Sequence, residues 1–465
     1  MDRKTNLIVV GAGGAGLTAA LTAAEAGLSV LILEKEGEIG GSTVMSGGSF
    51  ALAGTDIQEA NSIADTPSLL FDDLRRYGGN ENDPDVVRAY TENQAETYAW
   101  LRGLGAKFAP TVRDSPGNSV RRTHTITPSA VIPLLLEKAL ATGLVDIVYG
   151  ARAWKLTTDP TTGRATGVAV EGEEPFAAYA THGVVLASGG FTRSPELIKR
   201  FAPAFASARV SGGKGNTGDG LLMAWKLGAD LLDVGHIQGN FGVHPAGKSN
   251  AVVHPIYRGA IVVNKNGNRY VNEAITFKMH SNACMAQPGR ITYQIFDQGV
   301  MDKSDDSMPS FSFKSRVATG DVLKADTLAE LAGMIGVPPE NLENTLDRYN
   351  AGVDAGVDRD FGRTEIAPGI GPRVKIRTAP YYAFPSSVVI LGTYCGIRVD
   401  GAMRVIDVLG MEIDGLFAAG EVVGGFHGHG EIPGAALGKA LIFGRLAARS
   451  AATNTLYVAD TATMA

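Results

Sequence analysis

The feature that most constrains the fold of this 465-residue chain is a glycine-rich turn close to its start. An apolar run at residues 6–10 leads directly into Gly11-Ala12-Gly13-Gly14-Ala15-Gly16, and an Ala- and Leu-rich stretch follows at residues 17–26. A second apolar run, at residues 29–33, ends at Glu34. Strand, glycine turn, helix and strand in this order predict a βαβ unit of the dinucleotide-binding kind. We therefore expect an α/β fold with a Rossmann-like domain.

The spacing of the glycines matches the mechanical needs of a pyrophosphate site. Gly11 permits the tight turn, Gly13 lets backbone N–H groups approach the phosphates, and Gly16 lets the helix pack on the strand. The helix N-terminus then directs its partial positive charge at the two phosphates. Glu34 stands where a carboxylate accepts hydrogen bonds from ribose hydroxyls. A ligand-free glycine turn is the alternative, but the flanking strand, helix and acid favour a dinucleotide.

A second cluster of small residues indicates which dinucleotide binds. Behind Glu34 the chain passes through Lys35 into a stretch rich in Gly, Ser and Thr, which offers backbone and hydroxyl donors to a longer cofactor. We predict that FAD extends along this stretch, although a solvent-exposed loop would have the same composition. The predicted FAD contacts beyond the first glycine turn are Glu34, Lys35, Gly41, Ser42, Thr43, Ser46, Gly47 and Gly48.

Composition and charge argue against several other classes of protein. A net charge of −6 without a basic block disfavours a nucleic-acid partner. The two cysteines, Cys284 and Cys395, are too few for a disulfide framework or a four-ligand metal site. No apolar run reaches the roughly 18 residues that span a bilayer, and the N-terminus carries no secretory cleavage site. We expect a soluble, cytoplasmic protein without a metal.

The dinucleotide domain is predicted to be built from both ends of the chain. Strands and helices alternate up to residue 235, polar and aromatic residues with mixed periodicity follow, and the α/β character returns after Pro380. We predict a glutathione-reductase-type FAD-binding domain from residues 1–235 and 372–465, with an inserted α+β capping domain at residues 236–371. A cleft between two such bodies is a common place for a substrate.

Several helices and strands can be predicted individually. Asp83 and Pro84 have the character of an N-cap and a first helical residue. We expect two strands between residues 148 and 170, around a turn at 160–163, and another at 183–187. The expected long helices after the first βαβ unit lie at residues 84–101, 128–140, 326–334, 339–349 and 436–452.

The chain as a whole resembles the flavoprotein family of soluble fumarate reductases, succinate dehydrogenase flavoprotein subunits, urocanate reductase and 3-ketosteroid dehydrogenases. Besides the two glycine clusters, the shared motifs are Ala187-Ser188-Gly189-Gly190-Phe191, Thr217-Gly218-Asp219-Gly220, GAIVVNKNGNRYVNE at residues 259–273 and GLFAAGEVVGGFHG at residues 415–428. The resemblance implies FAD contacts at Ser188, Gly189, Gly190, Asp219 and Glu421, and at the backbone of Ala153, Ala436 and Leu437. Some members of the resembled family attach FAD covalently through a histidine in the loop that matches residues 40–48. This loop contains no histidine here, so we expect non-covalent FAD.

The same resemblance shows where the chain departs from a fumarate reductase. In the fumarate reductases that this chain resembles, two histidines and two arginines surround and bind a dicarboxylate. The histidine positions fall on Asn240 and Gly392, and the arginine positions on Glu431 and Phe277. A carboxylate and a phenyl ring cannot pair with a dianion, and an unpaired buried charge is costly. The segment at residues 430–434 is more similar to ketosteroid dehydrogenases, although Ile432 stands where a tyrosine is expected.

Five residues are candidates for the catalytic groups. Hydride transfer from a carbon needs a base for the neighbouring C–H and a group that polarises an adjacent carbonyl. Tyr394 and His427 fall in loops that border the flavin in the family, and Tyr257 and Arg258 fall in the inserted domain. Glu431 is a partner for a cationic substrate or for Arg258. Each has a structural alternative, namely packing, loop hydrogen bonding or a solvated surface charge.

We predict an FAD-dependent enzyme that transfers a hydride between flavin N5 and a carbon–carbon bond next to a carbonyl. The missing proton-delivering arginine favours a dehydrogenase acting on a ketone or similar small molecule, with an external electron acceptor or donor. The alternatives are a fumarate-reductase-like enoate reductase, a flavin oxidase that uses oxygen, and a non-catalytic flavin-binding subunit.

Overall fold

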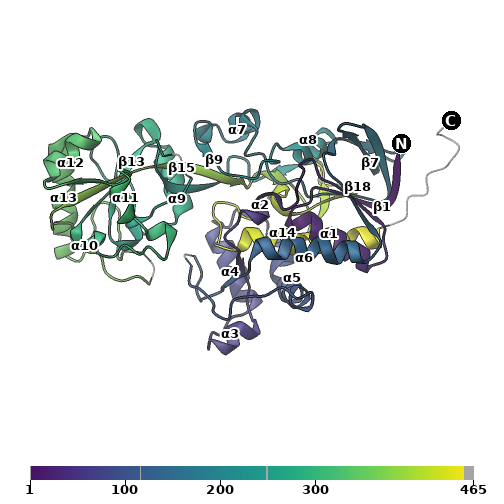
Figure 1. Ribbon diagram of the computed structural model, residues 1–465, viewed down its shortest axis with the longest axis horizontal. Coiled ribbons are helices and arrows are strands. Elements are labelled where there is room, and N and C mark those ends of the chain that lie inside the picture. The colour runs from purple at the N-terminus through teal and green to yellow at the C-terminus, as the bar shows by residue number, and fades with distance from the viewer. Residues whose placement is uncertain (1, 116, 248–249, 368, 455–465) are drawn as a thin grey trace. The chain divides into compact units, whose positions relative to one another are not determined.

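The computed structural model describes residues 2–115, 117–247, 250–367 and 369–454. The chain divides into two compact units, and each is described by itself (Figure 1). Unit 1 comprises Met1–Pro203, Gly212–Ile237 and Gly392–Ala465, and unit 2 comprises Ala204–Ser211 and Gln238–Leu391.

The centre of unit 1 is a parallel sheet built around the first strand. β1 (Arg3–Val10) pairs in parallel with β2 (Val30–Leu33) on one side and β8 (Phe176–Leu186) on the other. All four residues of β2 are buried, as expected for a strand covered on both faces. The strand order is β17-β18-β8-β1-β2-β5. The outer strands are β5 (Val145–Val148), β17 (Arg404–Ile406) and β18 (Glu412–Ala418).

Two helices from opposite ends of the chain pack together in unit 1. α1 (Gly14–Glu25) follows the glycine turn, and α14 (Ala435–Thr453) comes from the last part of the chain and lies beside it (Figure 1). A Cβ at Gly444 of α14 would overlap the backbone carbonyl of Ala15 in α1. Glycine and alanine therefore allow the two backbones to approach closely.

The remaining elements of unit 1 extend the sheet or cover it. β6 (Arg152–Thr158) and β7 (Ala165–Glu171) form an antiparallel hairpin that continues from β8. The Asp83 side chain accepts hydrogen bonds from the backbone N–H groups of Asp85 and Val86 and so caps α5. The other elements are α2 (Gly41–Val44), β3 (Ser49–Ala51), α3 (Asp56–Ala60), α4 (Pro67–Tyr77), α5 (Pro84–Gly103), β4 (Thr123–Thr125), α6 (Pro128–Ala141), α7 (Pro195–Phe201), α8 (Asp219–Lys226), β10 (Leu231–Leu232), β16 (Gly396–Ile397) and η5 (Gly420–Val422).

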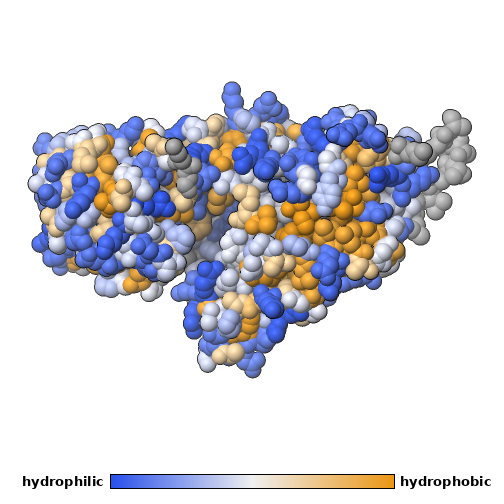
Figure 2. All heavy atoms as spheres, viewed as in Figure 1, coloured by the Kyte–Doolittle hydropathy of each residue, from blue (hydrophilic) through white to orange (hydrophobic). Residues whose placement is uncertain are grey.

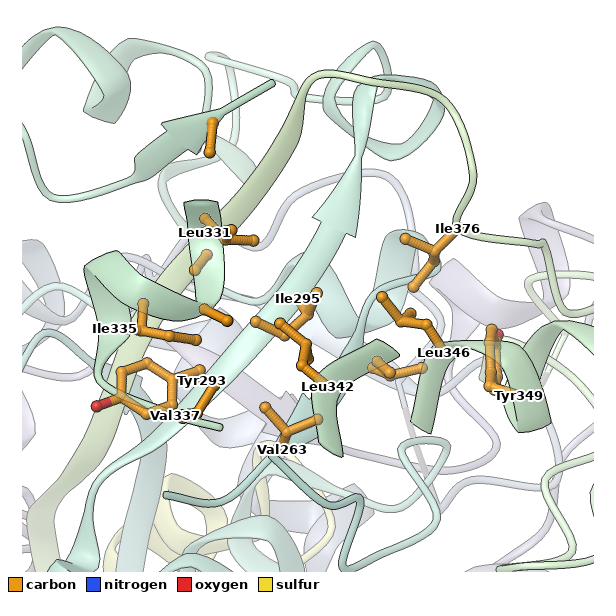
Figure 3. Close-up of a cluster of buried hydrophobic side chains, with 14 residues drawn as sticks. Val263, Tyr293, Ile295, Leu331, Ile335, Val337, Leu342, Leu346, Tyr349 and Ile376 are labelled. Atoms are coloured by element: carbon orange, nitrogen blue, oxygen red, sulfur yellow. The ribbon is translucent and has the colours of Figure 1, made fainter. Parts of the chain in front are cut away.

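Unit 2 is an α+β body with its own core. Its sheet has the order β11-β15-β13-β12, and β9 and β14 also pair with β15. Figure 3 shows Tyr293 and Ile295 of β13 facing Leu331, Ile335, Leu342 and Leu346 of the two covering helices. Its elements are η1 (Pro203–Phe205), β9 (Arg209–Val210), β11 (Ile237–Val243), η2 (Pro255–Arg258), β12 (Ile261–Val263), α9 (Phe277–Met285), η3 (Pro288–Arg290), β13 (Thr292–Asp297), α10 (Gln298–Met301), η4 (Pro309–Phe311), α11 (Ser315–Ala318), β14 (Leu323–Ala325), α12 (Leu328–Ile335), α13 (Pro339–Asp354) and β15 (Tyr381–Thr393).

The predicted helices at 84–101, 128–140, 326–334, 339–349 and 436–452 are present as α5, α6, α12, α13 and α14. The strand predicted at 183–187 begins earlier, at Phe176, and its first residues alternate between half-buried and buried positions. Unit 2 extends to Leu391, beyond the predicted boundary at residue 371. The reason is that β15 pairs with β13 and β14 through its first six residues.

Unit 1 has an apolar area on its surface. Figure 2 shows apolar side chains gathered on the face where α6 and α14 lie. Leu140, near the end of α6, is one of the exposed large apolar side chains. Among the described residues, no helix combines the length and the apolar character that a membrane span requires.

Candidate active site

The glycine turn of unit 1 has the geometry of a phosphate cradle. Gly11 has a φ of 106°, which an L side chain rarely adopts, and a Cβ at Gly16 would overlap the Gly11 carbonyl oxygen. By contrast, the nearest atom to a Cβ at Gly13 would be the Gly40 carbonyl oxygen at 3.7 Å. Packing therefore demands glycine at positions 11 and 16, whereas at position 13 the side chain is absent where a ligand would approach the backbone.

Glu34 lies at the end of β2, and its carboxylate faces the glycine turn. Its Oε2 accepts a hydrogen bond from the Ala12 N–H at 2.7 Å, and its Oε1 accepts one from the Glu36 N–H at 2.9 Å. Each carboxylate oxygen has a second lone pair. The side chain is therefore oriented by the protein and keeps acceptor capacity for ribose hydroxyls.

The second small-residue cluster forms α2 and the loop after it. Gly14 N–H donates to Thr43 Oγ1 at 3.1 Å, which joins the two glycine clusters. Ser42 Oγ accepts hydrogen bonds from the Gly213 N–H and the Asn216 side-chain amide, both at 3.1 Å. Gly41, Ser46 and Gly47 are exposed, whereas Gly48 is buried against the Ile126 carbonyl.

Asp219 begins α8 and is held by two cations. Its Oδ2 lies 2.6 Å from Lys35 Nζ, and its Oδ1 lies 2.8 Å from an Arg152 guanidinium nitrogen. Burial opposes the ionised form of Asp219, but the hydrogen bonds from Arg152, Lys35 and Thr217 outweigh it and lower its pKa. The structure thus brings Lys35 and Asp219 together and adds Arg152, beside Ala153, as a residue that the motifs did not reveal. Ala153 itself is buried in β6.

Ser188, Gly189, Gly190 and Glu421 meet at the carboxyl ends of β8 and β18. Glu421 accepts hydrogen bonds from the Thr393 N–H and the Asn216 side chain, both at 3.0 Å, and burial raises its pKa. The Ser188 hydroxyl is buried, and no described residue provides it with a hydrogen-bond partner. A buried hydroxyl without a protein partner fits a bound ligand at this place, so the residues present fit the dinucleotide.

The N-terminus of α14 completes this side of unit 1. Gly434 (φ 95°) is its N-cap, and Ala436 and Leu437 lie in its first turn, where backbone N–H groups lack helical acceptors. Lys439, one turn further, is 2% exposed and donates a hydrogen bond to the Val423 carbonyl. Burial lowers the Lys439 pKa to about 8. The sequence analysis missed this lysine because an isolated Lys in an Ala-rich helix gives no signal of burial.

Three of the five catalytic candidates lie together in unit 1. Tyr394 Oη donates a hydrogen bond of 2.7 Å to Glu431 Oε2, and the centroids of the Tyr394 and His427 rings are 4.4 Å apart. Tyr394 and His427 are 2% and 4% exposed, so both rings are shielded from water, whereas Glu431 is half-buried. Burial and the Glu431 carboxylate raise the Tyr394 pKa well above its usual range. The pair is therefore a neutral phenol that donates to a carboxylate.

Tyr257 and Arg258, the other two candidates, lie in unit 2. The Tyr257 hydroxyl donates to the Ile275 carbonyl at 2.9 Å, and the Arg258 guanidinium lies 3.9 Å from the centre of the Phe311 ring. Asn240, at one histidine position of the fumarate clamp, has a buried Oδ1 for which no described residue is a hydrogen-bond partner. Phe277, at an arginine position, stacks with His254.

Comparisons with known proteins agree with this geometry. The family model described as FAD binding domain matches residues 6–437. The chain is 33% identical over 457 residues to a fumarate reductase (cytochrome) of Shewanella frigidimarina, covering 96% of this chain and 77% of that protein. It is 30% identical to a 3-oxosteroid 1-dehydrogenase of Mycobacterium tuberculosis, with 99% of both chains covered.

A solved structure supports the same assignment. The chain matches a 3-ketosteroid-Δ4-(5α)-dehydrogenase from Rhodococcus jostii with a TM-score of 0.82 and 27% identity, covering 97% of both chains. The predicted resemblance, the α/β fold and the FAD cofactor are therefore confirmed. The chain belongs to the FAD-binding flavoprotein family of fumarate reductases and ketosteroid dehydrogenases, and is an FAD-dependent oxidoreductase of carbon–carbon bonds.

Proposed function

We propose that this enzyme is a dehydrogenase that removes hydrogen from a carbon–carbon bond next to a carbonyl, and that its substrate is not a dicarboxylate. The observation that carries the proposal is the part-buried hydrogen bond of 2.7 Å from Tyr394 to Glu431. It puts a carboxylate, already engaged by a phenol, where the family resemblance expects a cation.

FAD supplies the hydride acceptor in this proposal. The glycine turn, Glu34 and Ser188 would hold the dinucleotide, and the first turn of α14 would direct N–H groups toward the flavin. The remaining residues predicted to contact FAD, including Asp219 and Glu421, belong to the same proposed site. Asp219 would act through Lys35 and Arg152, since its oxygens are engaged by both cations.

Charge decides against a dicarboxylate substrate. The relative from Shewanella frigidimarina is named a fumarate reductase, but in this chain the four clamp positions hold Asn240, Gly392, Glu431 and Phe277, none of them a cation. A dianion next to the Glu431 carboxylate would meet repulsion in a poorly solvated site, where electrostatic energies are large. An uncharged ketone avoids this electrostatic penalty. The relative from Mycobacterium tuberculosis is named for such a substrate, a 3-oxosteroid.

Tyr394 and Glu431 would carry the proton. In the proposed step the Tyr394 oxygen takes the proton of the C–H next to the carbonyl, and Tyr394 passes its own proton to Glu431 Oε2. Bound FAD would accept a hydride from the neighbouring carbon, so that the C–C bond would become a C=C bond. Because its pKa is raised, Tyr394 stays protonated, and a neutral phenol is a weak base. The hydrogen-bonded Glu431 carboxylate would take the phenol proton and so allow the Tyr394 oxygen to accept the proton of the substrate. His427 would hold the Tyr394 ring in place.

The proposal is tested by the charge preference of the reduced enzyme. Photoreduced holoenzyme is mixed anaerobically with fumarate and, in parallel, with an uncharged cyclic enone, and recovery of the flavin absorption band is followed. We expect reoxidation by the enone at least 100-fold faster than by fumarate, in line with about 3 kcal/mol of electrostatic discrimination. Rapid reoxidation by fumarate would refute the charge argument.

A further inference from the structure

Lys439, in the second turn of α14, is a cation in the interior of unit 1. Its side chain is buried, and its Nζ donates a hydrogen bond to the Val423 carbonyl. Burying an ammonium group is costly, and a methionine side chain would fill the same space without that cost. Packing alone therefore does not explain a lysine at this position.

The charge of Lys439 is not cancelled by a direct ion pair. Among the residues that the structure describes, none forms a salt bridge with its ammonium group. Burial lowers the pKa of Lys439 to about 8, although the carboxylates of Asp233, Glu421 and Glu431 face it and favour its charged form. The lysine is therefore mostly protonated at pH 7, and its positive charge is available to act on neighbouring groups.

The loop that accepts the hydrogen bond of this lysine is also held from two other sides. Asp233, whose φ of 57° is uncommon for a residue other than glycine, accepts hydrogen bonds from the Gly425 N–H at 2.9 Å and the Gly428 N–H at 3.3 Å. The Asn82 side chain donates to the Phe426 carbonyl at 3.2 Å. The buried ammonium group therefore has a fixed position, and a fixed charge needs no reorganisation when charge develops beside it.

Lys439 lies between chain segments that are proposed to contact FAD. Its backbone is two residues beyond Leu437, and the carbonyl that it binds is two residues beyond Glu421. Cα atoms two positions apart in a chain are separated by at most about 7 Å. Burial raises the pKa of Glu421, and the charge of Lys439 is one of the effects that oppose this rise. The field of the lysine therefore reaches a residue of the proposed cofactor site.

We infer that Lys439 raises the reduction potential of bound FAD, so that the cofactor accepts a hydride more readily. Reduction makes the flavin ring more negative, and a fixed cation in a poorly solvated site stabilises such charge. This inference rests on the part of the proposed function that places FAD against Glu421 and the first turn of α14. It depends neither on the substrate nor on the direction of the reaction.

The test is the midpoint potential of the holoenzyme without substrate, measured at pH 7 by anaerobic equilibration with a redox dye. The wild type is compared with Lys439→Met and with the control Lys199→Met, which removes an exposed lysine of α7. We expect Lys439→Met to lower the potential by at least about 30 mV, a tenfold change in the equilibrium constant of a two-electron couple. Lys199→Met should match the wild type. An unchanged potential in Lys439→Met with bound FAD would overturn the inference.

A second substitution separates the effect of charge from damage to the loop. Asp233→Asn keeps an oxygen that accepts the hydrogen bonds of Gly425 and Gly428, but it removes a negative charge that faces Lys439. The midpoint potential should therefore rise in Asp233→Asn and fall in Lys439→Met. A lower potential in both variants would indicate a displaced loop and would contradict the inference.

The remaining outcomes also decide the matter. If Lys439→Met does not retain FAD, Lys439→Gln replaces it with the same expectation, because glutamine keeps a donor for the Val423 carbonyl. Loss of FAD from both variants would assign the lysine a structural role and refute the inference. If no ketone or enone changes the redox state of the wild-type flavin but the two opposite shifts in potential persist, the proposed reaction is wrong and the role of Lys439 stands.

Discussion

At the scale of single residues, Glu431 is the residue on which the proposed substrate preference depends, because the family resemblance predicts a cation at its position. Glu431 is half-buried and accepts a hydrogen bond of 2.7 Å from the buried Tyr394. Removing its charge should disable the proton step without emptying the cofactor site, since none of the hydrogen bonds found for Glu34, Asp219 or Glu421 involves Glu431.

Glu431→Gln should therefore lower kcat by about 100- to 1,000-fold, the range expected for losing a general base. FAD content should stay at the wild-type level, because glutamine preserves the shape and still accepts the Tyr394 hydrogen bond. Stopped-flow bleaching of the flavin by the best ketone substrate measures the effect, and the ratio of flavin to protein is the control. Wild-type bleaching by Glu431→Gln would remove the residue from the mechanism.

Gly16 tests the cofactor cradle at the same scale. A Cβ there would overlap the Gly11 carbonyl oxygen, so Gly16→Ala should displace α1 from the turn and abolish FAD binding. Gly37→Ala is the matched control, because a Cβ at Gly37 has no atom within 4 Å. Purified wild type and Gly37→Ala should be yellow and release FAD on denaturation, whereas Gly16→Ala should be colourless. A yellow Gly16→Ala protein would contradict the geometry of the cradle.

At the scale of elements, helices and short parallel strands could be predicted because each carries a local signal. The Asp83–Pro84 pair marks the start of α5, and the apolar run before the glycine turn marks β1. The predicted end of the inserted domain, at residue 371, differs from the end of unit 2, at Leu391, because strands pair with partners that are distant in the sequence. β15 belongs to unit 2 through its partners β13 and β14, which lie far away in the sequence.

Unit 2 has two elements whose histidines make its stability depend on pH. His254 at the start of η2 and His280 in α9 are both buried, and burial lowers each pKa from 6.5 to about 4. The folded state therefore keeps both histidines neutral while the unfolded state binds protons below pH 6.5. The contribution of the two histidines to the free energy of unfolding is fully present above pH 6.5 and is lost as the pH falls toward 4.

Chemical unfolding should reveal this loss as a free energy of unfolding that decreases from pH 7 to pH 5. The difference between 6.5 and about 4 corresponds to at most about 3 kcal/mol per histidine by pH 4. His254→Gln should show a shallower dependence than the wild type, because one proton-binding group has been removed. An unchanged or steeper slope in this variant would show that His254 is not a source of the acid sensitivity.

At the scale of the whole molecule, the sequence motifs predicted the family and its FAD cofactor, and the comparisons confirm both. The glycine turn and Glu34 are visible in one sequence, because a dinucleotide site needs glycines and an acidic residue at a fixed spacing. Arg152 and Lys439 could not be predicted, because only the fold pairs Arg152 with Asp219 and buries Lys439 against the Val423 carbonyl.

The central claim is that the substrate loses a proton from the carbon next to an uncharged carbonyl and a hydride, which FAD would accept, from the neighbouring carbon. Oxidised holoenzyme is mixed anaerobically with a panel of saturated cyclic ketones and of dicarboxylates including succinate, and the flavin absorption band is followed. We predict bleaching by at least one saturated ketone and none by succinate. Bleaching by succinate, or no bleaching by any ketone together with fast reoxidation of the reduced enzyme by enones, would contradict the proposed substrate or direction.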